Sequence, residues 1–335
     1  MGKKLNRANI LVAGGSGFIG TNLVKRLLPI GAKIRATVYK KPPQISDDRV
    51  EYLKCDLTRK EDCERAVQGI DYVFMCAANT SGAAVMRSTP LVHVTPNLLM
   101  NSQLLEAAYY AKVKKFVWPS SNAAYPPTGD RPVKEEELLT GDPHESQFAV
   151  GWMKRYTEVL CRMYSQTLKN PMPTVVLRPS NIYGPYDDFD YETSHVTAAL
   201  IRKVADRQNP LTVWGTGEDI RDLIYVDDFI DALLLAAEKI NTYDPINIGF
   251  GKGYSIKEIL QILLEIEDCS GIHITFDASK PSTIPIRLID TTKARKLLDF
   301  VPKTDLQEGL RKTIEWYREN QIKNPLSKNE FTQSK

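Results

Sequence analysis

Short apolar runs alternate with longer stretches of mixed polarity over the first 180 residues of the chain. An apolar run bounded by turn residues is typical of a buried strand, whereas apolar positions recurring every three or four residues indicate a helix. The strands are predicted at 9–13, 33–39, 50–53, 71–78, 115–118 and 174–178, and the main helices at 21–28, 96–111 and 148–168. This βαβαβ alternation predicts an α/β fold with a Rossmann-type doubly wound parallel sheet.

After residue 180 the predicted elements become shorter and the loops more frequent. This change indicates a smaller α/β substrate-binding lid domain beside the sheet. The chain accordingly divides into a dinucleotide-binding Rossmann domain, the lid domain and a polar tail predicted to be disordered: 1–180 with 226–249 returning to it, 181–225 together with 250–320, and 321–335.

Composition excludes several classes of protein. The 335 residues are 42% hydrophobic and 25% charged, as in ordinary globular proteins, and the net charge of +3 is too small to indicate nucleic acid or an anionic membrane as a partner. No apolar run approaches the roughly 20 residues that span a bilayer, and the first residues lack a signal-peptide apolar region. The five cysteines and four histidines have no metal-ligand spacing. We therefore expect free thiols, no metal and a cytoplasmic location.

A glycine-rich segment, GGSGFIG at 14–20, follows the first predicted strand and precedes a helix. Glycines in this context let the chain turn tightly and let its backbone approach a pyrophosphate at the helix N-terminus. We predict a nicotinamide dinucleotide site that includes Gly14, Gly17, Phe18 and Ile19.

The end of the second strand bears on which dinucleotide binds. An NAD site usually places Asp or Glu there to accept from the ribose 2′-hydroxyl, but this chain has Lys40 and Lys41. Two lysines favour the 2′-phosphate of NADP; a solvated strand end, compatible with NAD, is the alternative. Further cofactor contacts are predicted after the third and fourth strands, beside the adenine and the nicotinamide half: Asp56 with Leu57, and Ala77 with Ala78.

With these motifs the chain resembles the extended short-chain dehydrogenase/reductases of the nucleotide-sugar epimerase/dehydratase class. The matching signatures occur in the expected order: GGSGFIG at 14–20, CAA at 76–78, PSS at 119–121, LRPSNIYGP at 177–185 and IYVDD at 224–228. Within the class the pattern is most similar to the GDP-L-fucose synthases and their reductase/epimerase relatives. That similarity rests on SHV at 194–196, ALIR at 199–202, VWG at 213–215 and Arg221.

The resemblance implies a reaction in which hydride moves between the nicotinamide and a sugar carbon while a tyrosine exchanges the hydroxyl proton. The family uses a Ser or Thr together with a YxxxK pair, whose spacing puts both side chains on one helix face so that the ammonium lowers the phenol pKa. Ser121 and Lys154 match the hydroxyl and the lysine, but the tyrosine position is Val150. Valine has no proton to exchange. Either an engineered replacement or a natural loss of the tyrosine accounts for the valine at position 150.

Three other phenols lie near these motifs. Tyr156 stands two positions after Lys154, about 200° around the helix, and is expected to face elsewhere. Tyr125 and Tyr183 belong to other elements and remain candidates to replace the missing phenol at position 150. A second departure concerns epimerisation, because Ala123 stands where the fucose synthases have an acid/base cysteine.

The resemblance also implies the groups around the sugar. His195 matches the second acid/base group of the fucose synthases, with a packing role as the alternative. Arg221 is expected to bind the nucleotide diphosphate through its guanidinium fork, and Arg202, Arg287 and Asn181 are further substrate-binding candidates. A surface salt bridge is the alternative for each arginine. Relatives pair the helices at 96–111 and 148–168 in a homodimer, which we also expect here.

We therefore predict a nucleotide-sugar reductase or epimerase that transfers hydride between NADP and C4 of a 4-keto or 4-hydroxy hexose. GDP is the nucleotide that we expect to carry this sugar. Ala123 together with His195 is compatible with a 4-ketosugar reductase, a single-centre epimerase or a C4 epimerase. The alternatives are an NAD-dependent nucleotide-sugar 4-epimerase and, from another class, a catalytically dead pseudoenzyme that binds nucleotide sugars.

Overall fold

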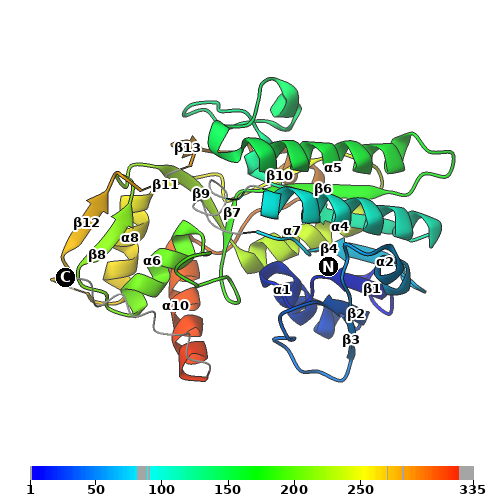
Figure 1. Cartoon of the computed structure of the whole chain (residues 1–335), viewed down its shortest axis with the longest axis horizontal. Helices are drawn as coiled ribbons and strands as arrows, with labels where there is room; N and C mark the ends of the chain where they lie inside the picture. The colour runs from blue at the N-terminus through cyan, green and yellow to red at the C-terminus, as the bar shows by residue number, and fades with distance from the viewer. Residues whose placement is uncertain (1, 81–88, 90, 270, 281–282, 324–335) are drawn as a thin grey trace.

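The structure is a computed structural model that describes residues 2–80, 89, 91–269, 271–280 and 283–323. A large part built on one sheet lies beside a smaller part that carries two further sheets of the described residues (Figure 1). The predicted α/β fold, a doubly wound parallel sheet with a smaller α/β part, is confirmed.

The large sheet contains seven parallel strands of the described residues: β1 (Asn9–Ala13), β2 (Lys33–Val38), β3 (Val50–Lys54), β4 (Tyr72–Met75), β5 (Lys115–Pro119), β6 (Thr174–Pro179) and β10 (Ile246–Ile248). Their spatial order is β10-β6-β5-β4-β1-β2-β3. The chain adds β2 and β3 on one side of β1 and all later strands on the other. The order therefore reverses between β1 and β4, and ligands of such sheets bind in the crevice outside the carboxyl ends of the strands at this point.

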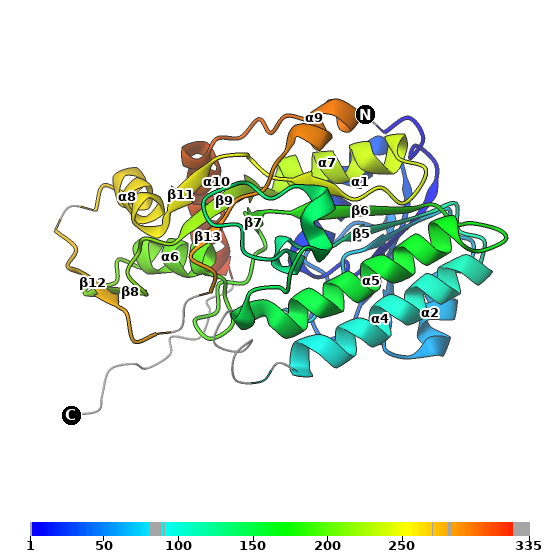
Figure 2. The ribbon, with the colours of Figure 1, turned by 90° about the horizontal axis from the view of Figure 1, so that it is seen from above.

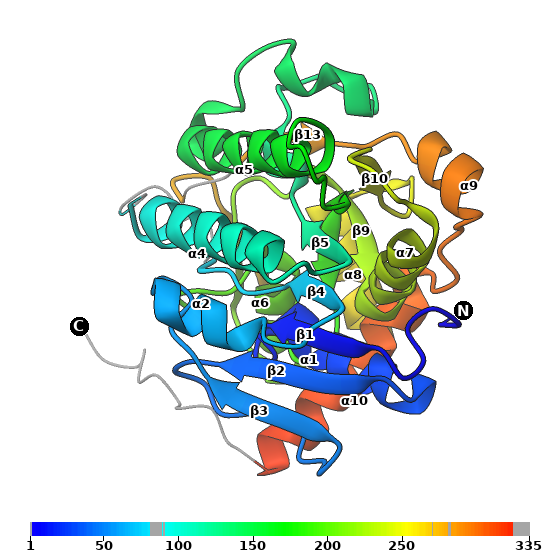
Figure 3. The same cartoon turned by 90° about the vertical axis from the view of Figure 1, so that its right-hand side faces the viewer.

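Helices cover both faces of this sheet (Figure 3). One face carries α1 (Phe18–Leu27), α7 (Val226–Lys239) and α9 (Thr292–Leu298), and the other carries α2 (Lys60–Ala66), α4 (Leu91–Tyr110) and α5 (Phe148–Gln166). Successive side chains of a strand point to opposite faces, so strands covered on both sides are apolar throughout. In β5, Val117 belongs to the core under α1 and α7, whereas Phe116 and Trp118 belong to the core under α4 and α5.

The smaller part has two sheets among the described residues. Its elements are β7 (Asn181–Tyr183), α6 (Val196–Ala205), β8 (Leu211–Trp214), β9 (Ile220–Tyr225), β11 (Gly253–Ser255), α8 (Ile256–Ile266), β12 (Ile274–Asp277), β13 (Ile286–Arg287) and α10 (Leu306–Lys323). One sheet has the order β11-β9-β13 with β7 also on β9, and the other pairs β12 with β8. Short 3₁₀ turns link elements of the whole chain: η1 (Leu28–Ile30), η2 (Asn122–Ala124), η3 (Glu135–Leu139) and η4 (Glu145–Gln147).

Helix α4 begins five residues before the position predicted from the sequence. Proline is common in the first turn of a helix, which is why Pro96 suggested a start there. The helix instead extends back to Leu91, although Pro96 has no N–H to donate to the carbonyl of Val92. The Nδ2 of Asn79 donates to that carbonyl at 2.9 Å. A side chain from the end of β4 therefore stabilises the extra turn.

The end of the chain also differs from the prediction. Residues 321–323, predicted to belong to a disordered tail, form the last turn of α10, and 324–335 lie outside the described residues. All five cysteines are free thiols, as expected. Within the described ranges, none of the helices combines the length and the apolar character that crossing a membrane requires.

Candidate functional site

The glycine-rich turn after β1 is pinned to the neighbouring strand. The N–H of Gly14 donates to Oγ1 of Thr37 at 2.8 Å, and the N–H of Gly15 donates to the Thr37 carbonyl at the same distance. Gly14 has φ of +83°, a left-handed conformation that favours glycine. A Cβ on Gly20 would lie 2.1 Å from the Gly14 carbonyl oxygen. Glycine at 20 therefore allows the first turn of α1 to pack directly on the loop.

The start of α1 is suited to bind an anion. Gly17 is the N-cap and provides no side-chain cap, and the first turn contains no acidic residue. The first N–H groups, from Phe18 and Ile19 onward, therefore combine with the positive end of the helix dipole. A pyrophosphate fits this arrangement, and the glycines leave room for it.

Two alanine substitutions separate packing from ligand binding in this loop. Gly20→Ala is expected to lower both the thermal midpoint and the cofactor affinity, because the new Cβ displaces the Gly14 carbonyl. Gly17→Ala is expected to leave the midpoint unchanged, since its Cβ meets only the Gly14 carbonyl at 3.4 Å, but to weaken cofactor binding. Thermal unfolding and NADP titration measure the two effects. Equal loss of stability in both variants would contradict this assignment.

The other predicted cofactor contacts lie along the same edge of the sheet. Lys40 and Lys41 are exposed just beyond β2. The Asp56 carboxylate accepts from the N–H and the hydroxyl of Thr58, and these bonds lower its pKa, while Leu57 is buried. A Cβ on Gly14 would lie 2.6 Å from the Cα of Ala77, so the turns after β1 and β4 are in contact. The neighbouring Ala78 is exposed.

The first turn of α5 packs on the segment that follows β5. Gly151 has no room for a side chain, because a Cβ there would lie 2.7 Å from the Ala123 carbonyl oxygen. Ser121, the N-cap of η2, accepts the Ala123 N–H at 3.1 Å and is half-buried. The predicted serine and the N-terminus of α5, which carries Val150, are thus brought together.

Lys154 is anchored at the end of β5. Its Nζ donates to the Pro119 carbonyl at 3.2 Å and lies 4.8 Å from the centre of the Trp118 ring. Burial lowers the pKa of Lys154 to about 8, and the charge of Glu158 opposes this shift. Val150 is one helical turn earlier and half-buried, so the lysine is in place while the family's phenol position holds an apolar side chain.

The other phenols are engaged elsewhere. Tyr125 is fully buried; its hydroxyl donates to Asn247 and accepts from Arg178, both at 2.7 Å. Tyr183 is also buried, and burial raises its pKa well above the usual value. Tyr156 is exposed on α5, away from the face of Lys154. These phenols are poorly placed to exchange a substrate proton.

His195 lies in the smaller part of the structure, at the N-cap of α6. Its ring reaches solvent but is crowded by protein atoms, and this burial lowers the pKa of His195; Asp188 raises it, and the charge of His93 lowers it further. Asn181 begins β7, and its Oδ1 accepts from Nδ2 of Asn122 at 3.3 Å. Asn181 thus connects β7 with the segment that contains Ser121.

Two predicted arginines lie side by side because β13 pairs with β9, which places Arg287 opposite Arg221. Arg287 donates to the Tyr125 and Pro126 carbonyls, and its buried Nε has no partner among the described residues. Burial and the charge of Arg221 lower the pKa of Arg287 to about 10. The Arg221 Nη atoms donate to the carbonyls of Ile220 and Pro285, to Asp219 and to Thr283.

The third arginine is held within the smaller part of the structure, on α6. Arg202 is buried, donates to the Phe189 carbonyl at 2.8 Å and stacks 3.6 Å from the centre of the Tyr191 ring. Its Nε lies 3.5 Å from a carboxylate oxygen of Asp206. These contacts order the segment before α6.

A comparison with protein families identifies the class. The family model described as "NAD dependent epimerase/dehydratase family" matches residues 10–249, most of the chain. The chain belongs to this family.

Similar proteins agree with this assignment. The chain is 30% identical over 325 residues to a protein named probable GDP-L-fucose synthase 1 from Oryza sativa subsp. japonica, and the aligned residues cover 93% of each chain. It is 32% identical to the GDP-L-fucose synthase of Escherichia coli over 76% of this chain and 83% of that protein. Among solved structures, a UDP-glucose 4-epimerase from Thermotoga maritima, determined with UDP-glucose, has a TM-score of 0.82 at 29% identity and covers 93% of this chain and 99% of its own.

One polar group on α4 of this epimerase/dehydratase family member was not predicted from its sequence. His93, Asn97 and Asn101 are polar, four residues apart, and all at most 4% exposed on α4. Their i, i+4, i+8 spacing puts them on one stripe of a helix, which was a detectable signal. The predicted helix start at Pro96 excluded His93 from the helix and hid the stripe.

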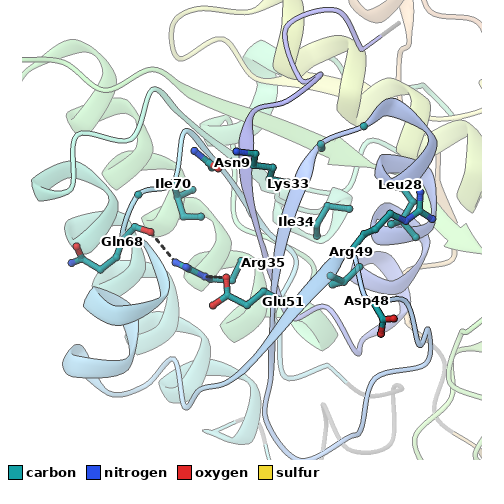
Figure 4. Close-up of a pocket in the computed structure, with 14 residues that line it drawn as sticks. Asn9, Leu28, Lys33, Ile34, Arg35, Asp48, Arg49, Glu51, Gln68 and Ile70 are labelled. Atoms are coloured by element: carbon teal, nitrogen blue, oxygen red, sulfur yellow. Dashed lines mark hydrogen bonds and ion pairs between the residues drawn. The ribbon is translucent and has the colours of Figure 1, made fainter.

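A hollow at the sheet edge opposite the glycine turn is not part of this site. It measures about 550 Å³ and opens at the amino ends of β1, β2 and β3 (Figure 4). Arg35, which crosses it, donates to Glu51 and to the carbonyls of Ala66 and Gln68. Its principal cation is therefore already bound within the chain.

Proposed function

We propose that this protein is an NADP-dependent reductase or epimerase acting at C4 of a nucleotide-linked, in the first instance GDP-linked, 4-keto or 4-hydroxy hexose. The observation that carries the proposal is the position of Lys154 and Ser121 at the carboxyl edge of the sheet that also holds the glycine turn. The names of the GDP-L-fucose synthases support the choice of GDP. The lid formed by 181–225 and 250–320 would carry the nucleotide sugar.

The proposed cofactor site uses the loop and the strand ends described above. The α1 N-terminus at Gly17 would hold the pyrophosphate, and Lys40 would bind the 2′-phosphate of NADP. Lys154 would hold the nicotinamide ribose, with Ala77 leaving space beside it. When bound, the nicotinamide supplies the hydride acceptor or donor.

Substrate binding is proposed to depend on the paired arginines. Arg221 and Arg287 are adjacent on β9 and β13, and the Asp219 carboxylate contacts Arg221. Two buried guanidinium groups with one contacting carboxylate favour a diphosphate. Asn181 and His195 would contact the sugar, and Arg202 would order the lid around it.

Arg287→Gln is expected to weaken the binding of GDP or UDP, whichever binds more tightly, by about tenfold, the effect of losing one charge-assisted hydrogen bond. Isothermal titration calorimetry measures the affinity, and thermal unfolding is followed in parallel. The matched control is Arg311→Gln on the exposed surface of α10, which is expected to have no effect. Unchanged affinity in Arg287→Gln would remove this residue from the site.

The cofactor could instead be NAD, in a nucleotide-sugar 4-epimerase that returns its hydride in each turnover. The UDP-glucose 4-epimerase structure favours this alternative. Lys40 and Lys41 favour NADP, because the end of β2 carries no acid for the ribose 2′-hydroxyl. Mass spectrometry of the molecules released by denaturation distinguishes the two, since a 4-epimerase is expected to retain NAD tightly.

The second function, from another class, is a catalytically inactive protein that binds nucleotide sugars. It is favoured by one observation, the valine at position 150. The test is to mix the protein with NADPH or NADP and with GDP-4-keto-6-deoxymannose, GDP-mannose or UDP-glucose, and to follow the sugar by chromatography. Conversion of one of them supports the enzyme; binding without conversion, in the native chain and in Val150→Tyr, supports the inactive protein.

We further propose a homodimer in a reducing, cytoplasmic compartment. The exposed face of α4 and α5 carries large apolar side chains, and a groove of about 620 Å³ lies between α5 and the 139–142 segment. These side chains include Leu99, Trp152, Tyr156 and Val159. Sedimentation is expected to give twice the mass of one chain.

A further inference from the structure

Helices α4 and α5 lie side by side on the same face of the large sheet (Figures 2 and 3). Each connects two parallel strands of that sheet, so both run from its carboxyl edge toward its amino edge and are parallel to each other. Nδ2 of Asn101 on α4 donates to Oγ1 of Thr157 on α5 at 3.3 Å. This hydrogen bond fixes the axial register of the two helices.

Measured along the helix axes from the Asn101–Thr157 hydrogen bond, His93 and Val150 lie at nearly the same height. Eight residues separate His93 from Asn101 and seven separate Val150 from Thr157, or about 12 and about 10.5 Å of helix at a rise of about 1.5 Å per residue. At about 100° per residue, seven residues end about 20° from the starting face of a helix and eight residues about 80° from it. His93 is therefore at nearly the same height along the helix pair as the position from which the family's phenol is missing.

The His93 side chain is held in one orientation. It is 2% exposed, and its Nδ1 lies 3.0 Å from the Asn79 carbonyl oxygen. Since a carbonyl only accepts, Nδ1 carries the proton and the lone pair of the neutral ring is on Nε2. Asn97 binds both the N–H and the carbonyl of Asn79, at 2.8 and 2.9 Å, which keeps this acceptor in place.

The other ring nitrogen is buried and unused. Nε2 of His93 has no hydrogen-bond partner in the described part of the chain. A buried polar atom without a partner costs free energy, so its presence calls for a ligand or a function. His93 is close enough to His195 that a charged imidazole at 93 would lower the pKa of His195, which places His93 within electrostatic reach of the predicted sugar site.

We propose that Nε2 of His93 exchanges the sugar hydroxyl proton in place of the missing tyrosine, so that the acid/base group of this protein is on α4 rather than α5. In the oxidative direction the O–H bond breaks and its proton goes to Nε2. The oxygen electron pair forms the carbonyl, and the hydride of the same carbon goes to the oxidised nicotinamide. Reduction reverses each transfer. This inference rests on the proposed function and specifies its proton donor.

The test uses the full chain with the nucleotide sugar that the substrate trial identifies. His93→Asn keeps a side-chain donor for the Asn79 carbonyl but removes the second ring nitrogen. It is expected to lower kcat by about 10²-fold, the lower end of the range for general acid–base groups, with KM changed less than about threefold. Adding Val150→Tyr to this variant is expected to restore kcat to within about tenfold of the native chain, which a structural defect on α4 would not allow. His273→Asn, the same change at an exposed histidine just before β12, is the matched control and is expected to retain kcat.

A second measurement does not depend on turnover or on the folding of a variant. In ¹⁵N-histidine NMR of the native chain, His93 is expected as the Nδ1–H tautomer, with an Nε2 resonance that shifts when the nucleotide sugar binds. An unshifted Nε2, or a kcat of His93→Asn equal to the native value, would overturn the proposal. An inactive native chain together with an active Val150→Tyr variant would also overturn the role of His93. That outcome would leave the proposed function intact. If both are inactive, the proposed function fails and the role of His93 with it.

Discussion

Lys154→Met is expected to weaken cofactor binding by about 10–100-fold, the effect of losing hydrogen bonds from a charged group worth about 1.5–3 kcal/mol. The native affinity should also depend on pH. Burial lowers the pKa of Lys154 to about 8, so the ammonium is present below this pH and is lost as the pH rises through it. We therefore expect the native affinity to fall above about pH 8 and the affinity of the variant to be independent of pH there. Fluorescence titration with NADPH between about pH 6.5 and 9.5 measures both effects.

The control for this experiment is Lys169→Met, at an exposed lysine beyond the end of α5. It is expected to keep the native affinity and the native pH dependence. If the native protein bound NADPH equally well on both sides of pH 8, Lys154 would not hold the cofactor through its charge.

Arg178→Met is expected to destabilise the protein by about 3–5 kcal/mol, because it leaves a buried carboxylate without its counter-charge. Arg178 and Glu158 are 2% and 1% exposed, and Nη2 lies 2.6 Å from Oε2. Arg178 also donates to the Tyr125 hydroxyl, and Ser120 donates to Glu158 at 2.7 Å. The ion pair thus connects β6, α5 and the segment that contains Ser121. Urea unfolding of the native and variant chains measures the change.

The double variant Glu158→Leu with Arg178→Met provides the comparison. Replacing both partners of a buried ion pair by apolar side chains commonly costs much less than removing one. The double variant is therefore expected to recover a large part of the loss. Equal destabilisation of the single and double variants would show that lost packing, and not an unpaired charge, is the cause.

Most of the large sheet was predictable because its signals are local. The apolar run at 9–13, the glycines at 14, 17 and 20, and the helix that follows lie within 20 residues, and the structure confirms their order. The start of α4 was predicted wrongly, because the bond that stabilises its first turn comes from Asn79, which lies outside the helix. The helix propensity of a residue such as Pro96 is a local property, so it does not reflect a hydrogen bond from the distant Asn79 side chain.

The sequence by itself determined the glycine turn between a strand and a helix, the spacing of Val150 and Lys154 and the absence of a phenol at position 150, because each follows from residues close together in the chain. Several such local motifs, in their order, also indicated the family. Only the tertiary structure decided that Arg221 and Arg287 are neighbours, since they meet through the pairing of β9 with β13. It likewise decided that His93 is level with Val150, through one hydrogen bond between two helices. Contacts between segments 56 or more residues apart depend on the packing of the whole chain, and no local pattern specifies them.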